Sequence, residues 1–169
     1  MLNVKFLNPF IDAAVEVLKV ETELDIVRGN LCLEKTALTA TDVTVLLTLV
    51  GKVQGVVMYG FSNDLSLELV SRMMGQKCTE FDNLAQSGIA ELGNVITGRA
   101  TIKLEEAGYK SMISPPTMIT GMGVKISTLD FSRIVVPLDT GLGEILIHLA
   151  LRESPPGNQD KNFVPINVS

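Results

Sequence analysis

The chain has 169 residues, of which 46% are hydrophobic and 20% are charged, and its formal net charge is −5. This length suits one domain with a sizeable buried core. A nucleic-acid-binding protein normally carries a basic patch, and this acidic chain contains no run of Lys or Arg, which argues against that class. Acidity alone identifies no partner.

The opening segment lacks the continuous apolar core of a signal peptide or a membrane span, because polar residues and a proline interrupt it. We therefore expect a cytoplasmic protein with no membrane insertion. Two cysteines, Cys32 and Cys78, are expected to be reduced thiols in that compartment. One histidine and no Cys/His cluster predict that the chain holds no metal ion.

The first half of the chain predicts a helix followed by strands. Apolar residues recur at spacings of three and four over Phe6–Val20, with Asn8 as a plausible cap and Pro9 in the first turn. Strand-like segments then flank the turn dipeptide Gly29-Asn30, and a long buried hairpin is expected around Gly51-Lys52. Its arms are Val43–Val50 and Gly55–Phe61.

Two further helices and a second set of strands follow. Asp64–Met74 predicts a short helix that Ser62 or Asn63 caps and Gly75 ends. Leu84–Ala107 predicts a long helix, with Asp82 or Asn83 at its cap. The later strand-like segments are Lys110–Ile113, Met118–Ser127, Arg133–Leu138 and Glu144–Leu151.

An order of helix, short strands and long hairpin occurs twice. Val45–Phe61 aligns loosely with Ile134–Ala150, although any two antiparallel hairpins share such features. A true repeat predicts an α+β fold, in which two long helices pack on one face of an antiparallel sheet with pseudo-twofold symmetry. We expect the domain to span residues 1–153, with a possibly disordered tail at 154–169.

The long helix has a core face and an exposed face when it is advanced by about 100° per residue. The expected core-facing residues are Ala85, Ile89, Leu92, Gly93, Ile96, Ala100, Leu104 and Ala107. The residues expected on or beside the opposite face are Ser87, Glu91, Asn94, Gly98, Thr101 and Glu105. Glu91 and Asn94 are neighbours there, and Gly98 leaves a bare patch beside them.

The residues alone leave two interpretations of this exposed face open. A Glu and an Asn three apart can simply be solvated, and Gly93 and Gly98 can both serve packing. Alternatively, a carboxylate and an amide beside a bare patch suit contact with another protein's backbone.

The segment SGIAELGNVITGRATIKLEEAG resembles the active-site helix of the CheC/CheX/FliY family of chemotaxis phosphatases. The family mark is Glu-x-x-Asn followed by glycine four residues after the Asn, here Glu91, Asn94 and Gly98. The resemblance extends over about Asn3–Arg152. The first helix carries no second Glu-x-x-Asn, which is the pattern of the CheX branch, and Arg99 departs from the small or neutral residue expected after Gly98.

The resemblance implies hydrolysis of the aspartyl phosphate on CheY or on a CheY-like receiver domain. Asn94 would orient the attacking water, and Glu91 would contact the receiver's lysine. Ser87, Gly98 and Thr101 would contribute partner contacts, and the receiver would supply Mg²⁺, with no cofactor bound by this chain. The resemblance further implies a homodimer formed by pairing of sheet edges.

Two rival functions stay open. The family shares its fold with flagellar-switch and adaptor proteins, so the chain can bind a receiver without hydrolysing anything. It can also serve a signalling pathway other than chemotaxis. Asn94 favours the enzyme, because a pure binder has no evident need for an amide beside Glu91. His148, inside an apolar strand, is interpreted as a packed histidine.

Overall fold

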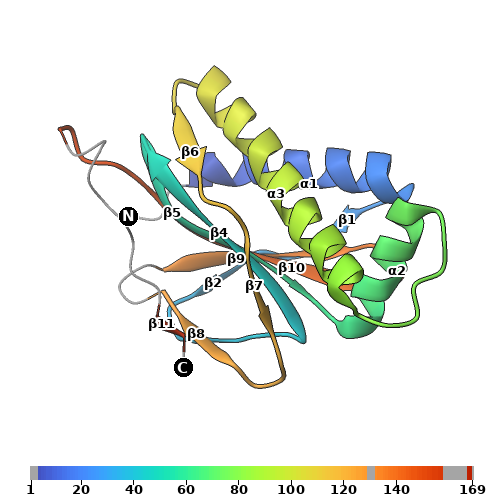
Figure 1. The fold of residues 1–169 in the computed structure, drawn as a ribbon. Helices are drawn as coiled ribbons and strands as arrows, with labels where there is room; N and C mark the ends of the chain where they lie inside the picture. Colours follow the sequence, from blue (N-terminus) through green and yellow to red (C-terminus); the bar gives the residue numbers. More distant parts are fainter. Residues whose placement is uncertain (1–3, 129–131, 158–166, 169) are drawn as a thin grey trace.

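A computed structural model describes residues 4–128, 132–157 and 167–168 (Figure 1). An eight-stranded antiparallel sheet forms the middle layer. Helices cover one face of this sheet, and a small three-stranded sheet lies against the other face. The predicted α+β fold with helices on an antiparallel sheet is confirmed.

The helical elements are the 3₁₀ turn η1 (Val4–Phe6), α1 (Leu7–Thr22), α2 (Asn63–Met74) and α3 (Asn83–Glu106). The strands are β1 (Val27–Arg28), β2 (Cys32–Glu34), β3 (Leu38–Thr39), β4 (Val43–Gly51), β5 (Val53–Phe61), β6 (Ser111–Ile113), β7 (Thr117–Thr120), β8 (Lys125–Ser127), β9 (Arg133–Asp139), β10 (Glu144–Glu153) and β11 (Asn167–Val168).

The large sheet is arranged symmetrically around its central pair, β5 and β10. Its order is β1-β9-β10-β5-β4-β6, and in addition β2 pairs with β9 and β7 pairs with β4. The two predicted hairpins, β4–β5 and β9–β10, therefore lie next to each other and are joined through β5 and β10. This is the arrangement that the repeat predicted.

The central strands are apolar throughout because both of their faces are covered. Every residue of β5 is buried. One set of alternating side chains packs under α1 and α3 in the main core. The other set joins a smaller second core against the three-stranded sheet, formed by Ala40, Leu46, Val56, Met58 and Ile126. A continuous hydrophobic run is the expected pattern for a strand in this position.

Helix ends follow the predicted chemistry in α2 but not in α1. The Ser62 hydroxyl accepts a hydrogen bond from the Leu65 amide at 3.1 Å, and Gly75 ends α2 with a left-handed φ of 67°. Asn8 was the wrong cap for α1, because η1 starts the helical turn earlier and Asn8 lies exposed inside the first turn of α1.

The strand-like segments on either side of the turn dipeptide Gly29-Asn30 do not pair with each other. Both β1 and β2 pair with β9 along the same edge of the sheet. The Gly29 amide donates to the Pro137 carbonyl at 2.8 Å between them. The position of Cys32 between Leu31 and Leu33 in a strand-like segment predicts core packing. Cys32 is instead exposed on this edge, so that prediction is wrong.

The stretch predicted as one strand over Met118–Ser127 is divided between two sheets. Gly121 (φ 129°) and Gly123 (φ 74°) turn the chain between β7, which pairs with β4, and β8, which pairs with β3 and β11. Most of the tail expected to be disordered lies outside the described residues, but Asn167–Val168 pairs with β8.

Among the described residues, no helix combines the length and the apolar content that crossing a membrane requires. Neither described cysteine forms a disulfide.

Candidate functional site

The long helix α3 begins and ends almost where the sequence predicted. The Asp82 carboxylate caps it by accepting a hydrogen bond from the Ala85 amide at 2.9 Å. Seven of the eight residues predicted to face the core are buried. The exception is Ala107, which lies exposed just beyond the last turn, and Thr97 was missed as a buried residue.

Thr97 fixes the rotation of α3 above the sheet. Its hydroxyl donates to the Gly93 carbonyl at 2.7 Å and lies 2.8 Å from the hydroxyl of Tyr59 in β5. Because the Thr97 proton is already used, Tyr59 is the donor in that second bond. Both side chains are fully buried, and burial raises the pKa of Tyr59. The helix is thereby held with its opposite face outward.

Gly93 allows α3 to lie close to the sheet. A Cβ atom at this position would stand 2.8 Å from Val45 Cγ1 and 3.4 Å from Tyr59 Cδ2. Gly93 therefore serves packing, which was one of the two interpretations left open.

Glu91 and Asn94 lie next to each other on the outward face. Glu91 is exposed and Asn94 is half-buried. No residue in the described ranges forms a hydrogen bond or ion pair with either side chain. Both polar groups are therefore available to another molecule.

Gly98 has no packing role within the described residues. A Cβ built on it meets no atom within 4 Å, so the position opens to space. Of the other predicted contact residues, Ser87 is exposed and Thr101 is half-buried, with its hydroxyl donating to the Gly98 carbonyl at 2.8 Å. The structure thus gathers all five predicted residues on one outward surface of α3.

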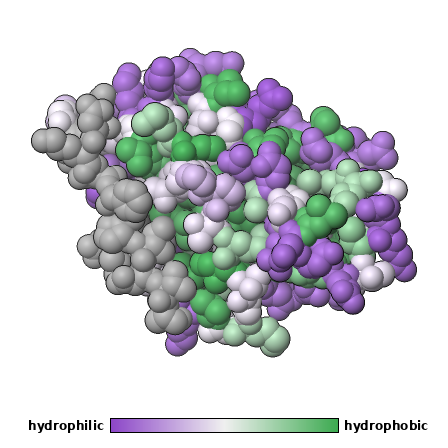
Figure 2. Space-filling view, viewed as in Figure 1, coloured by the Kyte–Doolittle hydropathy of each residue, from purple (hydrophilic) through white to green (hydrophobic). Residues whose placement is uncertain are grey.

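The sequence reasoning missed three large apolar side chains on this surface. Leu84 is 58% exposed, Val95 is 39% exposed and Ile102 is 52% exposed. They lie within about 40° of Glu91 around the helix axis. Figure 2 shows apolar and polar residues interspersed over the face that carries the helices. A helical wheel drawn with all residues, not the polar ones alone, would have found them.

Other groups with possible chemistry lie elsewhere. Within the described part of the chain, no three His, Cys, Asp or Glu side chains are grouped so that they can hold a metal ion. His148 is buried on the sheet face opposite α3, where its strand neighbour is Met58 of the second core. Burial, together with the nearby Arg133, lowers the pKa of His148 to about 4. The interpretation of His148 as a packed residue is confirmed.

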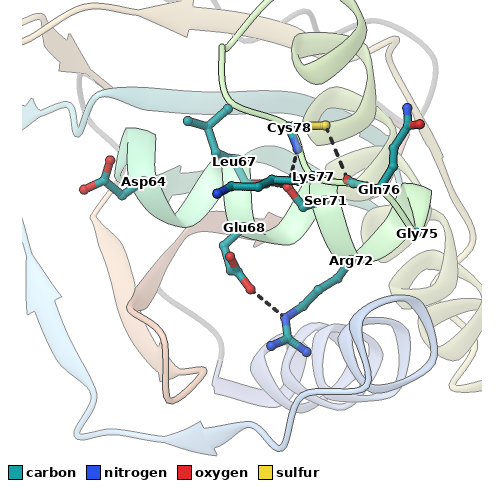
Figure 3. A pocket seen from close by; sticks show the side chains of 9 residues that line it. All are labelled: Asp64, Leu67, Glu68, Ser71, Arg72, Gly75, Gln76, Lys77 and Cys78. Atoms are coloured by element: carbon teal, nitrogen blue, oxygen red, sulfur yellow. Dashed lines mark hydrogen bonds and ion pairs between the residues drawn. The ribbon is translucent and has the colours of Figure 1, made fainter.

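A pocket of about 470 Å³ runs beside α2 and the loop that follows it (Figure 3). Its charged groups are of both signs, and Arg72 pairs with Glu68 at 3.1 Å. Cys78 in its wall is only partly exposed and lies 3.9 Å from the Gln76 carbonyl oxygen. This groove shows no unpaired buried group that would define a ligand.

The fold and the exposed Glu-x-x-Asn helix define a protein of the CheC-like class. The structure of a CheC-like superfamily protein from Shewanella sp. PV-4 matches this chain with a TM-score of 0.82 at 29% identity, covering 89% of this chain and 99% of that one. The family model described as chemotaxis phosphatase CheX matches residues 43–139, more than half of the chain. The chain belongs to the CheX family.

Two further relatives carry the CheX name. The CheY-P phosphatase CheX of Thermotoga maritima is 40% identical over 79 residues, and the match covers 46% of this chain and 51% of the relative. The chain thus spans about half the length of that curated relative. A CheX–CheY–BeF₃–Mg²⁺ complex from Borrelia burgdorferi shares the fold, with a TM-score of 0.70 at 22% identity, covering 89% of this chain and all of that one.

Proposed function

We propose that this chain is a phosphatase that hydrolyses the aspartyl phosphate of a CheY-type response regulator in chemotaxis signalling. The observation that carries the proposal is that the exposed Glu91 and the half-buried Asn94 lie side by side next to the open position of Gly98, with no hydrogen-bond partner among the described residues. Its support from relatives is the CheY-P phosphatase activity named for the Thermotoga maritima protein.

Asn94 orients the attacking water in this proposal. An amide both donates and accepts hydrogen bonds, so it can hold a water in line with the phosphorus–oxygen bond that breaks. The half-buried position of Asn94 restricts the side chain without occupying its polar atoms. Phosphoryl transfer depends mainly on positioning and charge stabilisation, so this chain needs no strong general base.

Glu91 fixes the docking register. Its exposed carboxylate, one turn before Asn94, makes a charge-assisted contact with the lysine of the receiver. Ser87 and Thr101 extend the contact surface along the helix. The receiver brings the phosphoaspartate together with Mg²⁺, which neutralises charge on the phosphoryl oxygens.

The proposal is tested by measuring decay of a phosphorylated CheY-type receiver in magnesium buffer. Wild type should accelerate the decay. Asn94→Ala should lower the rate of dephosphorylation by roughly a hundredfold or more. The receiver should still bind, because the amide acts on the water rather than on the partner. Glu91→Ala should weaken both binding and rate. Asn8→Ala, at an exposed asparagine of α1, is the matched control and should behave as wild type.

Full activity of Asn94→Ala would reject this assignment of the site. Binding of the receiver by wild type without any acceleration would instead support the adaptor function.

We also propose that two copies of the chain associate through the β1/β2 edge. Val27, Leu31 and Leu33 are 65%, 42% and 58% exposed there, beside the exposed Val4. No described strand pairs with the outer side of β1 or β2. Antiparallel pairing across a twofold axis makes such an edge complementary to itself, and it would cover these apolar side chains.

A further inference from the structure

The outward surface of α3 carries an apolar recess directly beyond the Glu91–Asn94 pair. Val95, Gly98, Arg99 and Ile102 occupy positions i, i+3, i+4 and i+7 of the helix. Four residues with this spacing surround the hole into which a side chain of a neighbouring helix packs. We refer to these four residues as the α3 hole.

The α3 hole is empty and open in this chain. A Cβ at Gly98 would meet nothing within 4 Å, so the floor of the hole is bare helix backbone. Val95 and Ile102 stand on either side of it and are 39% and 52% exposed. No described segment of this chain covers them.

Isolated exposed apolar residues are common and need no explanation. Here two of them bracket a glycine that the fold does not require, since packing leaves the space above it free and its conformation is helical. A glycine inside a helix weakens the helix relative to alanine. The combination instead suits close approach of a second helix, because a small residue at the contact shortens the distance between helix axes.

The position of the hole indicates its occupant. Gly98 follows Asn94 by one turn, about 6 Å along the axis, and Ile102 lies one further turn away. A receiver docked on Glu91 and Asn94 therefore lies next to the hole. Arg99 on its rim has no ion-pair partner among the described residues, so it favours an acidic group beside the inserted side chain.

We propose that the α3 hole binds an apolar side chain on a helix of the receiver domain, and that Val95, Gly98 and Ile102 thereby select which receiver is dephosphorylated. This inference rests on the proposed function, because it adds a specificity site to the same surface. The polar pair acts on the phosphoryl group, and the hole contributes affinity for the partner.

The experiment separates affinity from chemistry in steady-state dephosphorylation of a CheY-type receiver. Gly98→Leu fills the hole and Ile102→Glu places a charge at its wall. Each should raise KM by roughly tenfold or more and change kcat by about twofold or less, as expected when a contact outside the reacting centre is lost. Asn94→Ala should show the opposite pattern, a fall in kcat. Val20→Glu, at an apolar residue of α1 that is 77% exposed, is the matched control and should leave both constants unchanged.

Two measurements keep the inference distinct from the proposed function. Thermal unfolding of each variant shows that it is folded. Binding to a BeF₃-activated receiver measures the hole directly, whether or not wild type hydrolyses the phosphate. Unchanged binding and KM in both hole variants would overturn the inference while leaving the phosphatase intact. Loss of a dimer in Ile102→Glu by sedimentation, with receiver binding unchanged, would assign the hole to a second copy and would also overturn it.

Discussion

Two glycines of α3, five residues apart, differ in what an added methyl group would meet. At Gly93 it would meet Val45 Cγ1 at 2.8 Å, in the packed layer between helix and sheet. At Gly98 it would meet nothing within 4 Å. The helical period already placed Gly93 on the core face and Gly98 on the opposite face. Only the neighbouring strands show that Gly93 leaves no room for a side chain.

The same substitution at these glycines should therefore have opposite effects on stability. Gly98→Ala should raise the free energy of unfolding by up to about 1 kcal/mol through helix propensity, while weakening receiver binding. Gly93→Ala should lower it by about 1–3 kcal/mol, because the helix must move off β4 and β5. Urea unfolding of the two variants compares them directly. A destabilised Gly98→Ala protein would contradict the open position of that residue.

His148 gives the stability of the folded chain a pH dependence of known sign. Its pKa is about 4 in the folded state, against about 6.5 in an unfolded chain. Between these values the unfolded state binds the proton and the folded state does not, so stability should fall as pH decreases from about 6.5 to about 4. The loss should be on the order of 3 kcal/mol.

Chemical unfolding at a series of pH values measures this slope. His148→Gln, which does not titrate, should remove the His148 share of it. An unchanged slope in that variant would show that other groups cause the acid sensitivity.

At the scale of the element, the orientation of α3 depends on a buried polar contact. Tyr59 donates to Thr97 at 2.8 Å, and Thr97 in turn donates to Gly93. The 3.6-residue period predicted the apolar core face and the outward Glu91–Asn94 pair. It did not predict Thr97, because a threonine counts as polar in a helical pattern and only the folded sheet shows that the Tyr59 hydroxyl lies opposite it.

Removing this hydrogen bond should lower the stability of the fold while leaving the activity of the outward surface largely intact. Tyr59→Phe should lower the free energy of unfolding by about 1 kcal/mol, the usual contribution of one buried hydrogen bond. Receiver dephosphorylation at low temperature should change less than in Asn94→Ala. Thermal melts and initial rates measured on one preparation test both expectations. A variant as stable as wild type would mean that the contact does not hold the helix.

For the strands, the local sequence pattern predicts some pairings and not others. The β4–β5 and β9–β10 hairpins were predicted because long apolar arms around glycine turns have few other solutions. The division of Met118–Ser127 into two strands was not predicted. The chain passes from one sheet to the other at Gly121–Gly123, and a turn signal in the sequence does not show which strand the following segment will pair with. The exposure of Cys32 likewise depends on β2 being an edge strand.

For the molecule as a whole, the symmetric sheet leaves an apolar edge at β1 and β2 that a second copy can cover. Leu33→Lys should shift the chain toward monomer in sedimentation experiments, because a charge would enter the proposed interface. The exposed Cys32 beside it provides a second readout, since mild oxidation should cross-link two copies through this residue. A dimer that survives Leu33→Lys and does not cross-link would place the interface elsewhere.

The second sheet, β3-β8-β11, was not predicted from the sequence. Its strands are only two or three residues long, too short to show a hydrophobic period. The site, in contrast, lies on a single helix, so its five predicted residues could be assigned to one surface without knowledge of the sheet.

The role of Asn94 can be measured by single-turnover decay of a phosphorylated CheY-type receiver, with wild type or Asn94→Ala present at a concentration that saturates binding. Saturation removes differences in docking, so the decay rate reports the chemical step alone. We predict rapid decay with wild type and decay at the receiver's intrinsic rate with Asn94→Ala. Equal acceleration by both proteins would contradict the assignment of water positioning to Asn94.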